Sequence, residues 1–143
     1  MENMPAFTLH RPETAAEAVR LKATDATSRY LAGGTDMIVN VRRGIEAPEV
    51  MIDLTAIAAI TEIVPDGEGL RIGAGVKLSD IAAHDGIRRD FPAVAQAAAS
   101  VAGPTHRQYG TIGGNLCLDT RCLFYNQSQW WRESNNFCLK HKG

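Results

Sequence analysis

Two glycine-rich turns are the parts of the sequence best suited to bind a ligand, because glycine lets a backbone approach a bound group closely. The first turn comprises residues 32–36 (Ala-Gly-Gly-Thr-Asp), at an expected strand-to-helix junction. A helix start offers unpaired amides and the positive end of a dipole, which together suit a phosphate or pyrophosphate. The second turn comprises residues 110–116, where Thr111 and Asn115 add hydrogen-bonding side chains. Neither turn is a Gly-x-Gly-x-x-Gly motif or a P-loop, and each alone also fits a plain structural turn.

Three cysteines in the last third of the chain form a second candidate cluster: Cys117, Cys122 and Cys138. Their odd number argues against a disulfide framework, and clustered thiols in a reducing compartment indicate a metal or iron–sulfur centre. The alternative is that the thiols are buried and pack as small hydrophobic groups. Zinc bound by the three cysteines and His141 is a further alternative, although the spacings match no familiar zinc module.

The elements that position the first turn predict a small α/β lobe with parallel strands. Thr14 and Glu17 fit a capping box at the start of a first helix, whose apolar face includes Ala18 and Val19. Basic residues followed by Gly44 indicate where a second helix ends. The remaining elements of this lobe are expected at residues 29–32 (strand), from about 35 to 43 (helix) and 50–54 (strand).

A change of character near residues 54–59 predicts a boundary between two lobes. Two strand-like runs follow, at residues 60–64 and 70–74, and flank a Pro-Asp-Gly-Glu-Gly segment. Such a segment between two apolar runs is typical of a hairpin turn. The second lobe is therefore expected to begin with antiparallel strands.

Helical segments are expected to follow this hairpin. Ser79 is placed to cap a short helix, and Pro92 to begin an alanine-rich buried helix that ends near Val101. The residues after it, including His106 and Arg107, are expected to form a solvated loop, the alternative being that these two side chains approach a phosphate. This loop leads into the second glycine turn.

Composition excludes several classes of protein. The 143 residues suit one domain or two small lobes, and 45% apolar residues allow an ordinary core. Fifteen basic residues are balanced by sixteen acidic ones, which gives no footprint for nucleic acid. No apolar run approaches the roughly 20 residues that cross a bilayer, so no membrane partner is expected. The N-terminus lacks the features of a signal peptide, which predicts a cytoplasmic protein.

The two turns together resemble the FAD-binding domain of the molybdenum hydroxylase family, which includes xanthine dehydrogenases, carbon monoxide dehydrogenases and aldehyde oxidoreductases. The resemblance rests on Leu-Ala-Gly-Gly-Thr-Asp at residues 31–36, Gly-Thr-Ile-Gly-Gly-Asn-Leu-Cys at residues 110–117 and the strand at residues 50–54. It implies an α+β fold, with an α/β lobe at residues 1–57 and a lobe with a mainly antiparallel sheet beginning in residues 58–143. It also implies further strands and a C-terminal domain beyond Gly143.

The resemblance implies which residues contact FAD. The first turn would surround the pyrophosphate, the second would also touch the cofactor, and Val101 would line the flavin pocket. Leu118 stands where some relatives have a polar contact, and Cys117 is expected to pack in the interior. No residue is expected to be an acid–base catalyst. The implied cofactor-binding residues are Arg29, Tyr30, Leu31, Ala32, Gly33, Gly34, Thr35, Asp36, Val101, Thr111, Gly114 and Asn115.

The segment from about residue 119 resembles a cysteine-bearing insertion in 4-hydroxybenzoyl-CoA reductase, where the flavin subunit holds an extra [4Fe–4S] cluster. The likeness rests on Thr-Arg-Cys at residues 120–122 and on the paired tryptophans at residues 130–131. It implies Cys122 and Cys138 as two of four cluster ligands, the other two lying beyond Gly143. A less close insertion occurs in some periplasmic aldehyde oxidoreductases.

The resemblance implies an electron-transfer function. FAD would exchange electrons with [2Fe–2S] centres on a small partner subunit, which serve a molybdopterin site on a large subunit. The assembly would be a dimer of heterotrimers that uses an external electron carrier such as ferredoxin, and a 4-hydroxybenzoyl-CoA reductase-like reaction is expected. The alternatives are the flavin subunit of an aldehyde or xanthine/N-heterocycle dehydrogenase, and an assembly or zinc-stabilised module without redox activity.

Overall fold

A three-stranded parallel sheet forms the first part of the structure, a computed structural model that describes residues 4–118 and 127–137. The strand order is β1-β3-β2, with Thr8 opposite Val50 and Tyr30 opposite Ile52. Parallel neighbours require helical crossovers, which α1 and α2 supply. The elements are β1 (Thr8–His10), α1 (Ala15–Thr24), β2 (Arg29–Leu31), α2 (Met37–Arg42) and β3 (Val50–Asp53).

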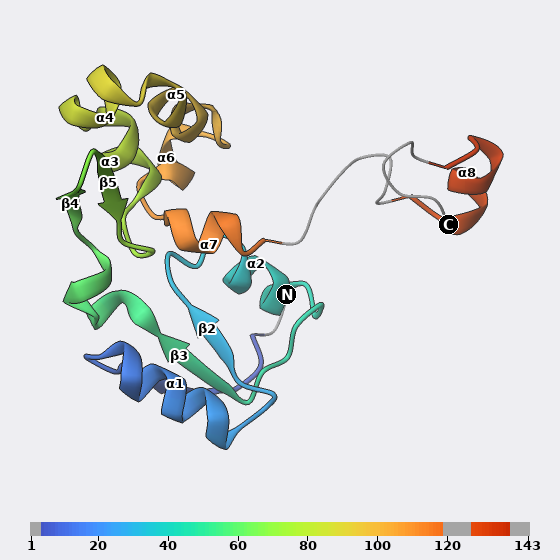
Figure 1. Cartoon of the computed structure of the whole chain (residues 1–143). Helices are drawn as coiled ribbons and strands as arrows, with labels where there is room; N and C mark the ends of the chain where they lie inside the picture. Colours follow the sequence, from blue (N-terminus) through green and yellow to red (C-terminus); the bar gives the residue numbers. More distant parts are fainter. Residues whose placement is uncertain (1–3, 119–126, 138–143) are drawn as a thin grey trace.

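The central strand β3 carries the core of this lobe. Met51 and Ile52 are fully buried in it, and Ile52 packs with Ala18 of α1 and with Ile57. Figure 1 shows α1 lying along the sheet. The predicted α/β lobe with parallel strands is confirmed, and Ala18 faces the core as expected. The prediction for Val19 was wrong: its side chain is 61% exposed, because the apolar face of α1 is narrower than the sequence suggested.

Local hydrogen bonds explain where α1 begins and how the chain turns after it. The Thr14 hydroxyl accepts from the Glu17 amide at 3.2 Å, while the Glu17 carboxylate accepts from the Glu13 amide at 3.3 Å. The expected cap is therefore present, with its return bond one residue earlier than in a standard capping box. In the turn after α1, the Thr27 hydroxyl and amide donate to Asp25, and these bonds lower the pKa of that exposed carboxyl.

An antiparallel hairpin and a group of short helices follow. The hairpin is tighter than the sequence predicted, because Gly67 has a φ of 60° and the strands pair up to Asp66 and Gly69. Before it come two 3₁₀ turns, Leu54–Ala56 and Ala58–Ile60. The other elements are β4 (Ile63–Asp66), β5 (Gly69–Ile72), α3 (Leu78–Ala83), α4 (Asp85–Asp90), α5 (Pro92–Ser100), α6 (Pro104–Arg107), α7 (Ile112–Leu116) and α8 (Gln129–Ser134).

The helices α3, α4 and α5 form a second core, seen in the upper part of Figure 1. Ile81 and Ile87 are fully buried there, and Ala95 and Ala98 bury one face of α5. Pro92 opens α5 as predicted, but the expectation of a buried helix was wrong, because Ala95 and Ala98 are its only buried residues. Ser79 does not cap α3, because the helix begins at Leu78 with Lys77 in the N-cap position. The Ser79 hydroxyl donates to the Asp80 carboxylate instead.

Two further expectations were wrong. Residues 104–107 form the short helix α6, with Pro104 in its first turn, where a solvated loop was expected. Cys117, expected in the interior, is exposed at the end of α7. No helix in the described ranges is long and apolar enough to cross a membrane.

Removal of the Ile52 side chain tests the central role of β3. Because Ile52 is fully buried between elements, Ile52→Ala should lower the free energy of unfolding by about 2–5 kcal/mol. Val19→Ala, on the exposed side of α1, is the matched control and should change it by less than about 0.5 kcal/mol. Chemical denaturation measures both, and comparable losses in the two variants would contradict the assignment of the core.

Candidate functional site

The first glycine turn joins β2 to α2 and depends on the absence of two side chains. Gly34 has a φ of 72°, a left-handed conformation that other residues rarely adopt. A Cβ added to Gly33 would lie 1.8 Å from the Tyr109 carbonyl oxygen and 3.0 Å from the Gly110 nitrogen. The turn is therefore pressed against the backbone that enters the second glycine turn.

This contact brings together the two turns that the sequence places far apart. A Cβ on Gly110 would lie 3.6 Å from the Thr35 hydroxyl oxygen, so the start of the second turn also lies close to the first turn. In Figure 1, α7 lies between the helices of the second core and the parallel sheet. The two turns predicted to share one ligand thus meet at one place in the fold.

The first turn offers donors. Among the described residues, none accepts a hydrogen bond from the backbone N–H of Gly33, Gly34 or Thr35. The turn itself is held by its carbonyl side, since Gly34 O accepts from Ile38 N at 3.2 Å, and the Asp36 carboxylate accepts from Asn40 at 3.0 Å. Three consecutive amides without a protein acceptor fit an anionic oxygen cluster such as a pyrophosphate.

The second turn is built differently, because its amides are used within the protein. Thr111 is buried, and its hydroxyl accepts from the Gly114 amide at 3.2 Å. The amides of Ile112 and Gly113 donate to the carbonyls of Val76 and Ala74, in the turn after β5, at 2.9 and 2.8 Å. This turn can therefore let a ligand approach its backbone closely and can offer a side chain, but its amides are already paired within the protein.

The side chain of Asn115 is the polar group that the second turn leaves for a ligand. Its backbone amide donates to Thr111 O at 2.9 Å, while no described residue forms a hydrogen bond with its side-chain amide. Gly114 beside it is exposed, which allows close contact at that point. The Thr111 hydroxyl shapes the turn through its bond with Gly114, and the predicted contacts of Thr111, Gly114 and Asn115 with a cofactor stay predictions.

Arg29 and Tyr30, two of the three residues that lead into the first turn, have other partners. Arg29 Nε lies 3.0 Å from the Glu46 carboxylate, and its Nη1 donates to the carbonyls of Thr27 and Ser28. The Tyr30 hydroxyl is 3.5 Å from the Ala18 carbonyl of α1. Their predicted contact with a cofactor stays a prediction, because these side chains are engaged with the first lobe.

Val101 ends α5 and packs against the second core with its side chain half-buried. It is followed by Ala102, whose φ of 45° is left-handed, and then by α6, which leads into the second turn. Val101 is thus on the same connection as the second turn, six residues before Arg107. Its predicted place beside a flavin stays a prediction.

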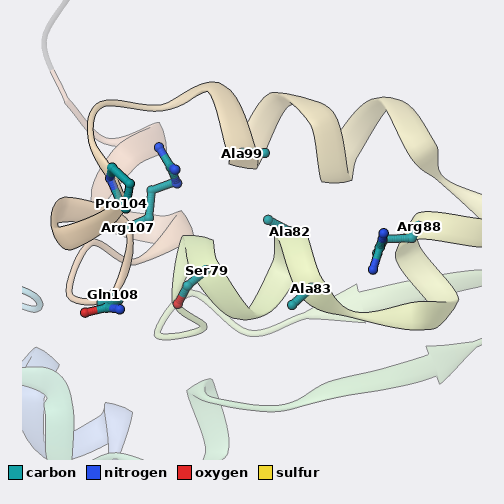
Figure 2. A pocket seen from close by; sticks show the side chains of 8 residues that line it. All are labelled: Ser79, Ala82, Ala83, Arg88, Ala99, Pro104, Arg107 and Gln108. Carbon is teal, nitrogen blue, oxygen red and sulfur yellow. The ribbon is translucent and has the colours of Figure 1, made fainter.

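A shallow groove of about 440 Å³ lies beside this connection (Figure 2). Ala99 of α5 lies across from Ala82 and Ala83 of α3, and Arg88 and Arg107 stand at opposite ends. It approaches the glycine turns only through Gln108. The residues that line it are Ser79, Ala82, Ala83, Arg88, Ala99, Pro104, Arg107 and Gln108.

The predicted metal ligands Cys122 and Cys138 lie outside the described residues. Among those described, no group of three or more His, Cys, Asp or Glu side chains is arranged to hold a metal ion. His141, part of the zinc alternative, is also outside this part of the chain. The cluster and the zinc site both stay predictions.

Sequence reasoning missed Tyr109, and it placed Arg107 in a solvated loop without the contacts that the structure gives it. The backbone of Tyr109 forms the surface on which Gly33 rests, and its side chain is 64% exposed at the junction of the turns. Arg107 Nη1 donates to the carbonyls of Val101 and Ala102. The Gly33–Tyr109 contact joins residues far apart in the chain, and the Arg107 bonds, which span only five and six residues, depend on the turn at Ala102.

Comparisons with known proteins agree with this geometry. The family model described as the FAD binding domain in molybdopterin dehydrogenase matches residues 5–122. The aldehyde oxidoreductase FAD-binding subunit PaoB of Escherichia coli strain K12 is 37% identical over 127 residues, which cover 88% of this chain and 40% of that protein. The xanthine dehydrogenase FAD-binding subunit of Escherichia coli O157:H7 is 33% identical over 109 residues, or 76% of this chain and 37% of that protein.

Solved structures show the same likeness. Carbon monoxide dehydrogenase from Hydrogenophaga pseudoflava superposes with a TM-score of 0.77 at 30% identity, over 80% of this chain and 40% of that one. Quinoline 2-oxidoreductase from Pseudomonas putida 86 gives a TM-score of 0.76 at 26% identity, with the same coverage. The chain spans about two fifths of the length of these proteins. It belongs to the family of FAD-binding domains of molybdopterin dehydrogenases.

Proposed function

We propose that this chain binds FAD across its two glycine turns, with the pyrophosphate at the first turn. The observation that carries the proposal is the set of three consecutive amides, on Gly33, Gly34 and Thr35, that no described residue accepts from. They lie where the second turn touches the first, so one extended ligand can reach both. The cofactor-binding residues of the proposal are Arg29, Tyr30, Leu31, Ala32, Gly33, Gly34, Thr35, Asp36, Val101, Thr111, Gly114 and Asn115.

The protein's part in this function is to bind and orient. The amides of the first turn donate to phosphate oxygens, and the missing side chains of Gly33 and Gly34 let the backbone come close. Thr111 holds the second turn in shape, and Asn115 presents an amide to the cofactor. When bound, FAD supplies reversible electron transfer, and the protein tunes its potential. No residue of this chain needs to act as an acid or base.

The proposed place of this domain is the flavin subunit of a molybdenum hydroxylase-type complex. Its relatives include subunits named as FAD-binding or medium chains of aldehyde, xanthine and carbon monoxide dehydrogenases, which supports the assignment. The partners would be a large molybdopterin-binding subunit and a small [2Fe–2S] subunit. An external carrier such as ferredoxin would exchange electrons with the complex, which would assemble as a dimer of heterotrimers.

Two reactions are candidates for the complex as a whole. The cysteine-bearing segment resembles that of 4-hydroxybenzoyl-CoA reductase, which favours reductive removal of a phenolic hydroxyl. The likeness to PaoB, which is named as an aldehyde oxidoreductase subunit and is 37% identical over 127 residues, favours aldehyde oxidation. Under either reaction, Cys122 and Cys138 are proposed ligands of an additional [4Fe–4S] cluster. An assembly or zinc-stabilised module is the non-redox alternative.

Substitution of Gly33 tests the FAD proposal. In Gly33→Ala the new Cβ meets backbone atoms of Tyr109, so the turns must separate and the purified full-length protein should lose most of its flavin. Gly69→Ala is the matched control, because its nearest atom would be 3.5 Å away, and it should retain flavin like the wild type. Flavin absorbance per mole of protein measures both. A wild-type protein without flavin, or a Gly33→Ala protein with a full complement, would refute the proposal.

Substitution of the cysteines tests the cluster. Because a [4Fe–4S] cluster generally needs four thiolates, Cys122→Ser and Cys138→Ser should each remove about four iron atoms per protein while flavin stays bound. Cys117→Ser is the control and should leave iron unchanged. Iron analysis and absorption spectra of the anaerobically purified complex give the readout. Wild-type iron in the Cys122 and Cys138 variants would exclude the cluster, and bound zinc in the wild type would support the zinc alternative.

A further inference from the structure

The connection between α5 and α6 adopts a conformation that its sequence alone does not favour. Ala102 has a φ of 45°, in the left-handed region where a side chain with a Cβ is strained. Alanine has no polar group with which to stabilise that conformation locally, unlike asparagine or aspartate. An interaction from elsewhere in the fold must therefore hold the turn.

Arg107 supplies that interaction. Its Nη1 donates to the Val101 carbonyl at 2.9 Å and to the Ala102 carbonyl at 2.8 Å. One nitrogen therefore bridges the two peptide carbonyls on either side of the strained Cα. The side chain is half-buried, which strengthens hydrogen bonds from a charged donor. Figure 2 shows Arg107 on α6, across the groove from the alanines of α3.

The same short helix fixes the second glycine turn. The Gly110 amide donates to the His106 carbonyl at 2.7 Å, and Gly110 O accepts from Leu78 N at 3.0 Å. Arg107 therefore links two segments: its side chain binds the Val101–Ala102 turn, and the helix that carries it binds Gly110. A change at Arg107 alters the distance between two segments that the proposed function places against FAD.

We propose that Arg107 is a positioning residue for the flavin: it holds the left-handed Val101–Ala102 turn at the separation from the second glycine turn that bound FAD requires. This inference rests on the proposed function. It assigns no contact between Arg107 and the cofactor, because the guanidinium acts through the two carbonyls that it binds.

The test compares Arg107→Gln with Arg88→Gln in the full-length, FAD-loaded protein. Both arginines line the same groove and both changes remove one positive charge, but the described residues give Arg88 no hydrogen bond to the Val101 turn. Arg107→Gln should raise the rate constant of FAD dissociation by about tenfold and shift the flavin midpoint potential, since two charge-assisted bonds are lost. Arg88→Gln should change the dissociation rate constant by less than about twofold and leave the midpoint potential unchanged.

Two further variants keep the test decisive if Arg107→Gln does not fold. Arg107→Lys retains the charge but loses the planar donor geometry, so it should release FAD faster than the wild type and more slowly than Arg107→Gln. Adding Ala102→Gly removes the strain of the left-handed residue and should restore part of the flavin retention in either Arg107 background.

The outcomes separate this inference from the function on which it rests. A wild-type protein that binds no FAD refutes the proposed function. If the wild type binds FAD, and folded Arg107 variants keep its dissociation rate and potential, the positioning role is overturned even if their unfolding midpoints fall. Failure of Ala102→Gly to restore any retention would also overturn it.

Discussion

The approach of Gly33 to the Tyr109–Gly110 peptide is the constraint on which the rest of the site depends. Two backbones meet there with no room for a single Cβ, and the contact joins the parallel sheet of the first lobe to the connection that carries α6 and α7. Because protein interiors are close-packed, such a contact has one geometry and does not slide gradually to another. The positions of both glycine turns follow from it.

In the proposed function the two turns divide the work of binding FAD. In the first, the amides of residues 33–35 have no described protein acceptor, and the turn is fixed through carbonyl and side-chain bonds. In the second, the amides of residues 112–114 are consumed by Ala74, Val76 and Thr111, so its shape is fixed before any ligand arrives. An anionic group bound there would have hydrogen-bond donors on one side and a rigid backbone on the other. Because the second turn is already ordered, binding would lose less conformational entropy.

Membership of the FAD-binding family and the geometry of the turns support each other. The family match covers residues 5–122, which contain both turns, both cores and the α5–α6 connection. Structures related at 26–30% identity share the fold over 80% of this chain. In the proposed function this domain holds the flavin, and the substrate reacts at a site on another subunit.

The sequence by itself determined the local elements and the identity of the two turns. The Thr14 cap, Pro92 at the start of α5 and the strand at residues 50–53 depend on contacts within a few residues, which composition and spacing reveal. Tertiary structure decided which face of α1 is buried, that residues 104–107 are helical, and that Cys117 is exposed. It also decided that Gly33 rests on Tyr109, because that contact joins residues whose proximity depends on the packing of whole elements. The bond from Arg107 to Ala102 spans only five residues, but it depends on a left-handed turn that the alanine itself does not favour.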